Sequence, residues 1–234
     1  MEESISIQVN FGRPMPMFPF RSVAVLPQQI APIPVVEPRY QQLVSSALDG
    51  AGQIALATYA GSGEIDVVGD PPVRKAACIA QIVQHERQPD GHYILLLQGI
   101  CRAGIIEETT EYEGNNYRTV MLEPLGLPFN DDEQLAEVRD ALDLMLCEGP
   151  LSKMAAASWV LERVRNDAIP PSALLELASF TLLTDDSIRY RLLAEPDATA
   201  RWGIVEYELH RLGRLIRMAE RQGARDWPKG LSWN

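Results

Sequence analysis

Prolines divide the stretch from Met15 to Val44 into short elements, and this division constrains the fold more than any other feature of the chain. A first apolar run ends at Pro27. A second apolar run contains Pro32 and Pro34, and proline cannot donate a hydrogen bond to a strand ladder. The second run therefore predicts an edge strand or a bulged strand. The next proline, at 38, fits the first turn of a helix, where its missing N–H leaves no helical partner unsatisfied.

Beyond this stretch, the apolar pattern indicates strands first and helices later. Strands are predicted at 53–59, 73–87, 92–107 and 117–124, and the two long ones flank a Pro89-Asp90-Gly91 turn. From residue 131 the apolar spacing changes from alternation to a helical period. Helices are predicted from Asn130 or Asp131 to Gly149-Pro150 and then over 151–166, 172–181, 185–194 and 198–222, the fourth capped by Thr184 or Asp185.

Several of these segments resemble the amino-terminal, substrate-binding domain of Lon proteases. The resemblance rests on Met17-Phe18-Pro19-Phe20-Arg21, on Glu37-Pro38-Arg39-Tyr40, on the Pro89-Asp90-Gly91 turn, on Gly99-x-x-Arg102 and on YRTVMLEP at 117–124. It implies an α+β fold in which a PUA-like, partly open β-barrel over 1–127 is followed by an α-helical bundle over 128–234. It also implies a non-catalytic protein- or peptide-recognition module that acts as an adaptor or client-binding protein. Its partners would be polypeptide clients or a protease complex.

The resemblance suggests roles for two groups of residues. Soft, apolar side chains near the N-terminus are candidates for binding unfolded peptides if they stay exposed, and they complete the barrel core if they do not. These candidates are Phe11, Met15, Met17 and Phe18. The signature residues are expected to be structural, with Arg39 and Tyr40 holding a helix against the barrel. They are Glu37, Pro38, Arg39, Tyr40, Pro89, Asp90, Gly91, Gly99 and Arg102.

The motifs of the Lon ATPase and peptidase are missing from the sequence. No G-x-x-x-x-G-K-[ST] segment exists, and none of the three lysines has a serine three residues before it. Ser152 and Lys153 are adjacent, so on a helix their side chains point in different directions. His85 and His92 flank the hairpin turn without a third ligand at metal-binding spacing. We therefore expect no catalytic activity, no metal and no cofactor.

Charge and composition restrict the partners further. The net charge is −11, and both halves of the chain are acidic: residues 1–125 hold 14 acidic and 8 basic side chains. This balance argues against a nucleic-acid partner, which requires clustered positive charge. RNA binding stays the alternative, since PUA-like barrels elsewhere bind RNA and five arginines follow one side of the last helix, namely Arg211, Arg214, Arg217, Arg221 and Arg225. Otherwise that side is a solvated helical face.

The chain has no run of about 18 apolar residues, no signal-peptide pattern at the N-terminus and only three cysteines. These features predict a cytoplasmic protein without a membrane span, and they leave the oligomeric state open. A four-residue hairpin loop would place Cys78 opposite Cys101 without a disulfide, provided that no bulge intervenes. A chain cut near Leu127 is expected to fold poorly, because the later helices would cover an apolar flank of the barrel.

Overall fold

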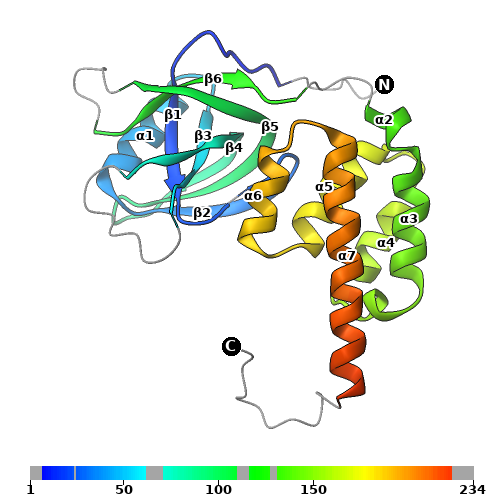
Figure 1. The fold of residues 1–234 in the computed structure, drawn as a ribbon. Helices are drawn as coiled ribbons and strands as arrows, with labels where there is room; N and C mark the ends of the chain where they lie inside the picture. The colour runs from blue at the N-terminus through cyan, green and yellow to red at the C-terminus, as the bar shows by residue number, and fades with distance from the viewer. Residues whose placement is uncertain (1–6, 24, 62–70, 110–115, 127–130, 223–234) are drawn as a thin grey trace. The chain divides into compact units, whose positions relative to one another are not determined.

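The structure, a computed structural model, describes residues 7–23, 25–61, 71–109, 116–126 and 131–222 (Figure 1). The chain forms two compact units. The sheet unit comprises residues 1–128 together with 185–197, and the helical unit comprises 129–184 and 198–234. The predicted α+β class is confirmed. The division at residues 1–127 and 128–234 stays a prediction, and the segment 185–197 groups with the sheet rather than with the other helices.

Six strands and one helix make up the first part of the sheet unit. They are β1 Met15–Phe20, β2 Ile30–Val35, α1 Pro38–Leu48, β3 Gln53–Tyr59, β4 Val73–Arg87, β5 Tyr93–Thr109 and β6 Thr119–Pro124. The strand order is β2-β5-β4-β3-β1-β6, and β6 also pairs with β5. The sheet thus curls back on itself without forming a regular barrel (Figure 1). As its prolines predicted, β2 is the edge strand.

The longest strand, β5, pairs with different strands along its length. Its first part, Tyr93–Gln98, pairs with β2, and its last part, Ala103–Thr109, pairs with β6. The strand β4 lies beside both parts. The sheet can therefore open at β2 and close at β6 only because β5 changes partners near Gly99.

The interior of the curled sheet combines large and very small side chains. Met15 and Met17 are 7% and 0% exposed, and they lie among four buried alanines and a few branched residues. The alanines leave room for the flexible methionine side chains, and the whole cluster is Met15, Met17, Ala55, Ala57, Ala77, Ile79, Ala103, Val120 and Leu122. Of the peptide-binding candidates, Met15 and Met17 are buried in this core, Phe18 is buried outside this cluster, and Phe11 is only partly buried against the core.

The predicted pairing of Cys78 with Cys101 is wrong. The hairpin closes with Arg87 opposite Tyr93, so its loop is one residue longer than expected. Register shifts then occur between Ile82 and Gln84 and again between Ile79 and Ala80, where Ile100 is the extra residue on β5. Cys78 consequently pairs with Arg102, and Cys101 pairs with Ile79. The two thiols lie on opposite faces of the sheet, because one inserted residue reverses the side-chain alternation.

The bulge lies beside Gly99, which touches another part of the backbone. A Cβ atom on Gly99 would lie 2.2 Å from the carbonyl oxygen of Leu26. Two backbone hydrogen bonds hold this approach: Gln28 N–H donates to Gly99 O at 2.8 Å, and Gly99 N–H donates to Gln29 O at 2.9 Å. Only glycine fits here, and the contact fixes where β2 begins.

The helix α6, Asp186–Ala194, belongs to the sheet unit and packs on β4. Asp185 caps it by accepting hydrogen bonds from the N–H groups of Ser187 and Ile188, as one of the two predicted caps. Buried Arg102 donates from Nε to the carbonyl oxygen of Leu192 at 3.0 Å. The Tyr190 hydroxyl accepts a hydrogen bond from Ala76 N–H at 3.1 Å. Arg102 thus joins β5 to α6, and the structural role expected for this signature residue stays a prediction.

The helical unit contains α2 Asp131–Gln134, α3 Ala136–Cys147, a 3-10 turn η1 Pro150–Lys153, α4 Ala157–Val164, α5 Pro171–Leu182 and α7 Ala198–Arg221. The first two predicted helices are each interrupted, at Leu135 and after Lys153. Leu135 and Leu151 are buried as a continuous helix would require, so apolar spacing alone could not reveal these breaks. On α7 the predicted arginine side is exposed at Arg211, Arg214, Arg217 and Arg221, and Arg225 lies outside the described residues. No helix among the described residues is long and apolar enough to cross a membrane.

Replacing Gly99 with alanine tests the backbone contact. We expect Gly99→Ala to lower the free energy of unfolding by about 3 kcal/mol or more, because Leu26 O is backbone and cannot turn away from the new methyl group. Gly203→Ala on α7 is the matched control: beyond the neighbouring backbone of its own helix, no atom lies within 4 Å of its Cβ position, so it should be neutral or stabilising by about 0.5–1 kcal/mol. Urea unfolding measures the free energy of unfolding of both variants, and equal changes would contradict the requirement for glycine at position 99.

Removing α6 or its contacts should destabilise the sheet unit. Tyr190→Phe leaves the buried N–H of Ala76 without its partner and should lower the free energy of unfolding by about 1–3 kcal/mol, whereas Tyr207→Phe at an exposed site on α7 should change it very little.

A fragment ending at residue 127 lacks α6 entirely and should lose cooperative thermal unfolding. A fragment with an unchanged melting temperature would show that the sheet does not depend on α6.

Candidate functional site

An aromatic groove of about 420 Å³ lies where β1 and β2 end and α1 begins. We call it the aromatic groove, and its lining residues are Phe18, Pro19, Phe20, Arg21, Pro34, Val36, Glu37, Tyr40 and Tyr59. Of the residues singled out from the sequence, Phe18, Glu37 and Tyr40 line it. Aromatic, proline and valine side chains make up most of the lining, and Arg21 and Glu37 add charged groups to it. The groove therefore suits apolar or aromatic groups of a ligand that also carries polar groups.

Alternation along β1 builds the floor of the aromatic groove. Met17 points into the core of the curled sheet, and its neighbours Phe18 and Phe20 therefore point to the opposite side. The Phe18 ring stacks on Phe20 with 4.6 Å between ring centroids and on Tyr40 with 4.3 Å. The stacked rings hold one another in place, so the floor is formed before any ligand arrives.

The helix α1 completes the groove from the other side. Its first residue is Pro38, and the turn that follows places Tyr40 against Phe18. The Arg39 guanidinium lies 4.6 Å from the centre of the Tyr40 ring, and its Nε donates to Glu37 Oε2 at 2.9 Å. Burial, together with a hydrogen bond to Tyr59, raises the pKa of the Tyr40 hydroxyl far above its ordinary value. The signature Glu37 to Tyr40 thus fixes one wall of the groove.

A strip of exposed apolar side chains continues from the groove along the sheet edge. Pro34 pairs with Ile94, and Pro32 pairs with Leu96, so these side chains share the outer face of β2 and β5. We call the apolar side chains of this face the β2–β5 strip, and they are Ile30, Pro32, Pro34, Ile94 and Leu96, with Gln98 opposite Ile30 on the same face. Ile30 is 55% exposed and Ile94 is 45% exposed. Because Pro34 belongs to both, the strip and the groove form one continuous surface.

Sequence reasoning missed several residues of this surface. Val36 is 55% exposed at the mouth of the groove, and Phe20 and Tyr59 also line it. The alternation of Phe18 with Phe20 was a usable signal for the groove floor. No sequence signal marked Tyr59, because its place depends on the pairing of β3 with β1. The remaining signature residues do not line the groove: Pro89, Asp90 and Gly91 form the hairpin turn, where Gly91 has a φ of +89°.

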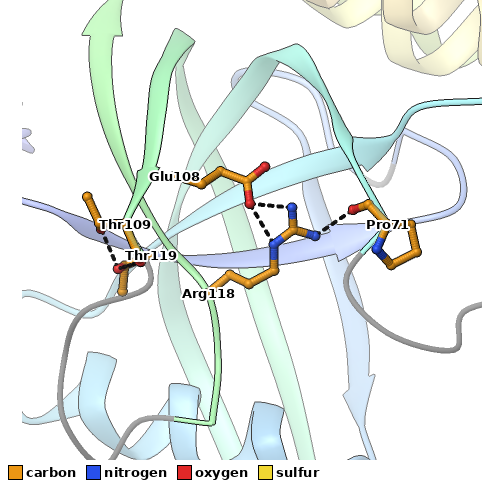
Figure 2. A network of polar contacts seen from close by, with 5 residues as sticks. All are labelled: Pro71, Glu108, Thr109, Arg118 and Thr119. Carbon is orange, nitrogen blue, oxygen red and sulfur yellow. Dashed lines mark hydrogen bonds and ion pairs between the residues drawn. The ribbon is translucent and has the colours of Figure 1, made fainter.

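A separate polar network braces the rim of the sheet (Figure 2). Arg118 binds Glu108 through its guanidinium, with 2.8 Å between Nε and Oε2, and its Nη1 donates to the carbonyl oxygen of Pro71 at 2.8 Å. Beside it, the Thr119 hydroxyl donates to Thr109 O at 2.7 Å. These contacts join the end of β5, the start of β6 and the residues before β4 (Figure 2). Their partners are mutually satisfied, so the network stabilises the sheet and offers no reactive group.

The residues considered for catalysis or metal binding have separate partners. The Ser152 hydroxyl donates to Gly149 O at 2.7 Å, and Lys153 forms an ion pair with Glu220. His92 Nδ1 lies 3.0 Å from Asp90 Oδ2 within the hairpin turn. Among the described residues, no group of three or more His, Cys, Asp or Glu side chains could hold a metal ion.

The raised pKa of Tyr40 predicts a loss of stability in alkaline solution. Above about pH 10 an unfolded tyrosine releases its proton, whereas folded Tyr40 retains it, so the free energy of unfolding falls as the pH rises. Tyr40→Phe cannot titrate at this position and should show a smaller fall between about pH 8 and about pH 10.5. Urea unfolding at both pH values measures this, with exposed Tyr207→Phe as control. Equal falls in the two variants would contradict the prediction.

Known proteins resemble this chain in sequence and in fold. Residues 14–211 match the family described as the ATP-dependent protease La (LON) substrate-binding domain. The Lon protease of Trichlorobacter lovleyi is 28% identical over 219 residues, which cover 89% of this chain and 26% of that protein. The Lon protease of Azorhizobium caulinodans is 27% identical over 94 residues, which cover 40% of this chain and 11% of that protein. The chain thus spans about a quarter of the length of the first relative.

Two solved structures have the same fold. The N-terminal domain of a Mycobacterium avium complex Lon protease superimposes with a TM-score of 0.64 at 18% identity, covering 85% of this chain and 98% of that one. A Lon N-terminal domain protein from Xanthomonas campestris gives a TM-score of 0.57 at 20% identity, covering 82% of this chain and 95% of that one. From its match over residues 14–211, the chain belongs to the family of Lon substrate-binding domains.

Proposed function

We propose that this chain recognises unfolded polypeptide segments, without transforming them, through the aromatic groove and the β2–β5 strip. One observation carries the proposal: a pre-formed aromatic groove continues, through Pro34, into an apolar face that is exposed along the sheet edge. Contiguous exposed apolar surface marks interaction sites in soluble proteins. A segment of unfolded chain supplies the apolar side chains that such a surface would bury.

The dimensions of the site fit side chains of a polypeptide. A groove of about 420 Å³ has room for one or two large side chains, which the strip could follow with further apolar contacts. Each large side chain that is fully buried contributes roughly 1.5–3 kcal/mol. A few such contacts give reversible, sequence-tolerant binding, which suits a protein that must accept many clients.

The family supports the same function and leaves its cellular context open. Its description names substrate binding, and the Lon protease of Trichlorobacter lovleyi is about four times as long as the region that matches this chain. We propose that this chain supplies client recognition as an adaptor or client-binding protein, with clients or a protease complex as partners. The excess of six acidic over basic side chains in residues 1–125 disfavours the RNA-binding alternative.

Placing a charge at the mouth of the groove tests the site. A fluorescein-labelled, reduced and carboxymethylated α-lactalbumin serves as a permanently unfolded client, and fluorescence anisotropy measures its binding. Val36→Glu should weaken binding about tenfold, since an unpaired carboxylate in an apolar contact costs at least ~1.4 kcal/mol. Ile106→Glu is the matched control, because Ile106 is 60% exposed on β5 outside the groove and the strip.

The outcomes separate the alternatives. Equal weakening by Val36→Glu and Ile106→Glu, or no binding by the wild-type protein, would contradict the proposed site. Binding of a labelled single-stranded RNA that falls steeply with salt would instead favour the nucleic-acid alternative.

A further inference from the structure

The edge strand β2 has an unusual distribution of hydrogen-bond donors. Its pairing with β5 runs without a shift from Ile30 opposite Gln98 to Val35 opposite Tyr93. In an antiparallel strand, N–H and C=O groups of successive residues point alternately to the two edges. An unbroken ladder therefore requires that Ala31, Ile33 and Val35 donate toward β5. The N atoms of Ile30, Pro32 and Pro34 then lie on the outer edge.

Two of these three outer positions are prolines. Pro32 and Pro34 have no N–H to donate, and their rings occupy the space that the carbonyl groups of an added strand would need. Among the described residues the sheet ends at β2, so no other strand covers this edge. Addition of a polypeptide as a seventh strand would leave its carbonyl groups without donors at two successive positions.

The face beside this proline-blocked edge is apolar along β2 and β5 and acidic at its border. The β2–β5 strip contains only isoleucine, leucine and proline side chains, Gln98 lies opposite Ile30, and Glu86 of β4 lies beside Ile94 on the same face. Residues 1–125 as a whole hold an excess of six acidic residues. An apolar segment that is flanked by basic residues complements both features. A second copy of the chain does not, because it would bring another net charge of −11.

We propose that the β2–β5 strip and the aromatic groove bind an extended, apolar segment with basic flanks by its side chains alone, without backbone pairing. This inference rests on the proposed function and specifies how the client is recognised. Side chains at alternate positions of an extended client would lie on Ile94 and Leu96 and enter the groove past Val36. The client backbone would make no ladder with β2.

Backbone methylation of a peptide tests the inference with the intact protein. The probe is a short fluorescein-labelled peptide with phenylalanine at alternate positions, serine between them and lysine at both ends. Two further versions carry N-methyl groups, one on the phenylalanines and one on the serines, so that either phase of a ladder is blocked. For side-chain recognition, all three dissociation constants should agree within about threefold, and loss of more than about tenfold for either version would overturn the inference.

Two protein variants make the result specific. Pro32→Val combined with Pro34→Val restores both outer donors, so this variant should gain sensitivity to N-methylation; if it stays insensitive, the role assigned to the prolines is wrong. Val36→Glu should weaken all three peptides alike. If the unmodified peptide does not bind, or binds Val36→Glu as tightly as the wild type, the proposed function itself fails. If the unmodified peptide binds and the N-methylated peptides do not, the further inference is overturned while the proposed function stands.

A peptide with glutamate in place of lysine tests the charge component. It should bind several-fold more weakly at low ionic strength, and the difference should shrink as salt screens the acidic surface. A glutamate-flanked peptide that binds equally well at low salt would overturn the assignment of basic flanks.

Discussion

The close approach of Gly99 to the backbone of Leu26 is the contact on which the rest of the sheet depends. Because Gly99 has no Cβ, the chain after β1 can lie against β5 at the position where β5 changes its partner from β2 to β6. The hydrogen bonds of Gln28 and Gln29 with Gly99 fix the start of β2. They thereby place Pro34 and Val36 at the groove. The geometry of the proposed site therefore follows from a contact that lies outside it.

The order of the elements could be predicted from the sequence, whereas the register could not. Prolines at 32 and 34 predicted an edge or bulged strand, Pro38 predicted the start of α1, and Asp185 was one of two predicted caps of α6, because each residue restricts the backbone locally. Register depends on where bulges occur, and the bulges at Val83 and Ile100 have no local signature beyond the nearby Gly99. One extra residue was enough to separate Cys78 from Cys101.

The candidate site was predictable only in part, for a related reason. The sequence drew attention to soft apolar side chains in β1, but alternation sends Met15 and Met17 inward and Phe18 and Phe20 to the groove. Small alanines on three other strands make the interior able to accept methionine, and this compensation is visible only when the strands are paired. Likewise, α6 lies far along the chain from β4, yet it satisfies a buried backbone N–H there.

An exposed, apolar sheet edge can aggregate, and many sheets avoid this by covering their edges or by placing charged residues on them. Exposed apolar side chains along an edge strand invite pairing with other edges and hence aggregation. Proline at alternate positions removes the donors and the space that such pairing needs, and it leaves the apolar side chains of Ile30 and Ile94 exposed and that of Leu96 half-buried. The same two residues thus allow apolar contact and prevent strand addition. Protection against aggregation and the side-chain recognition of clients that we propose would both follow from one backbone constraint.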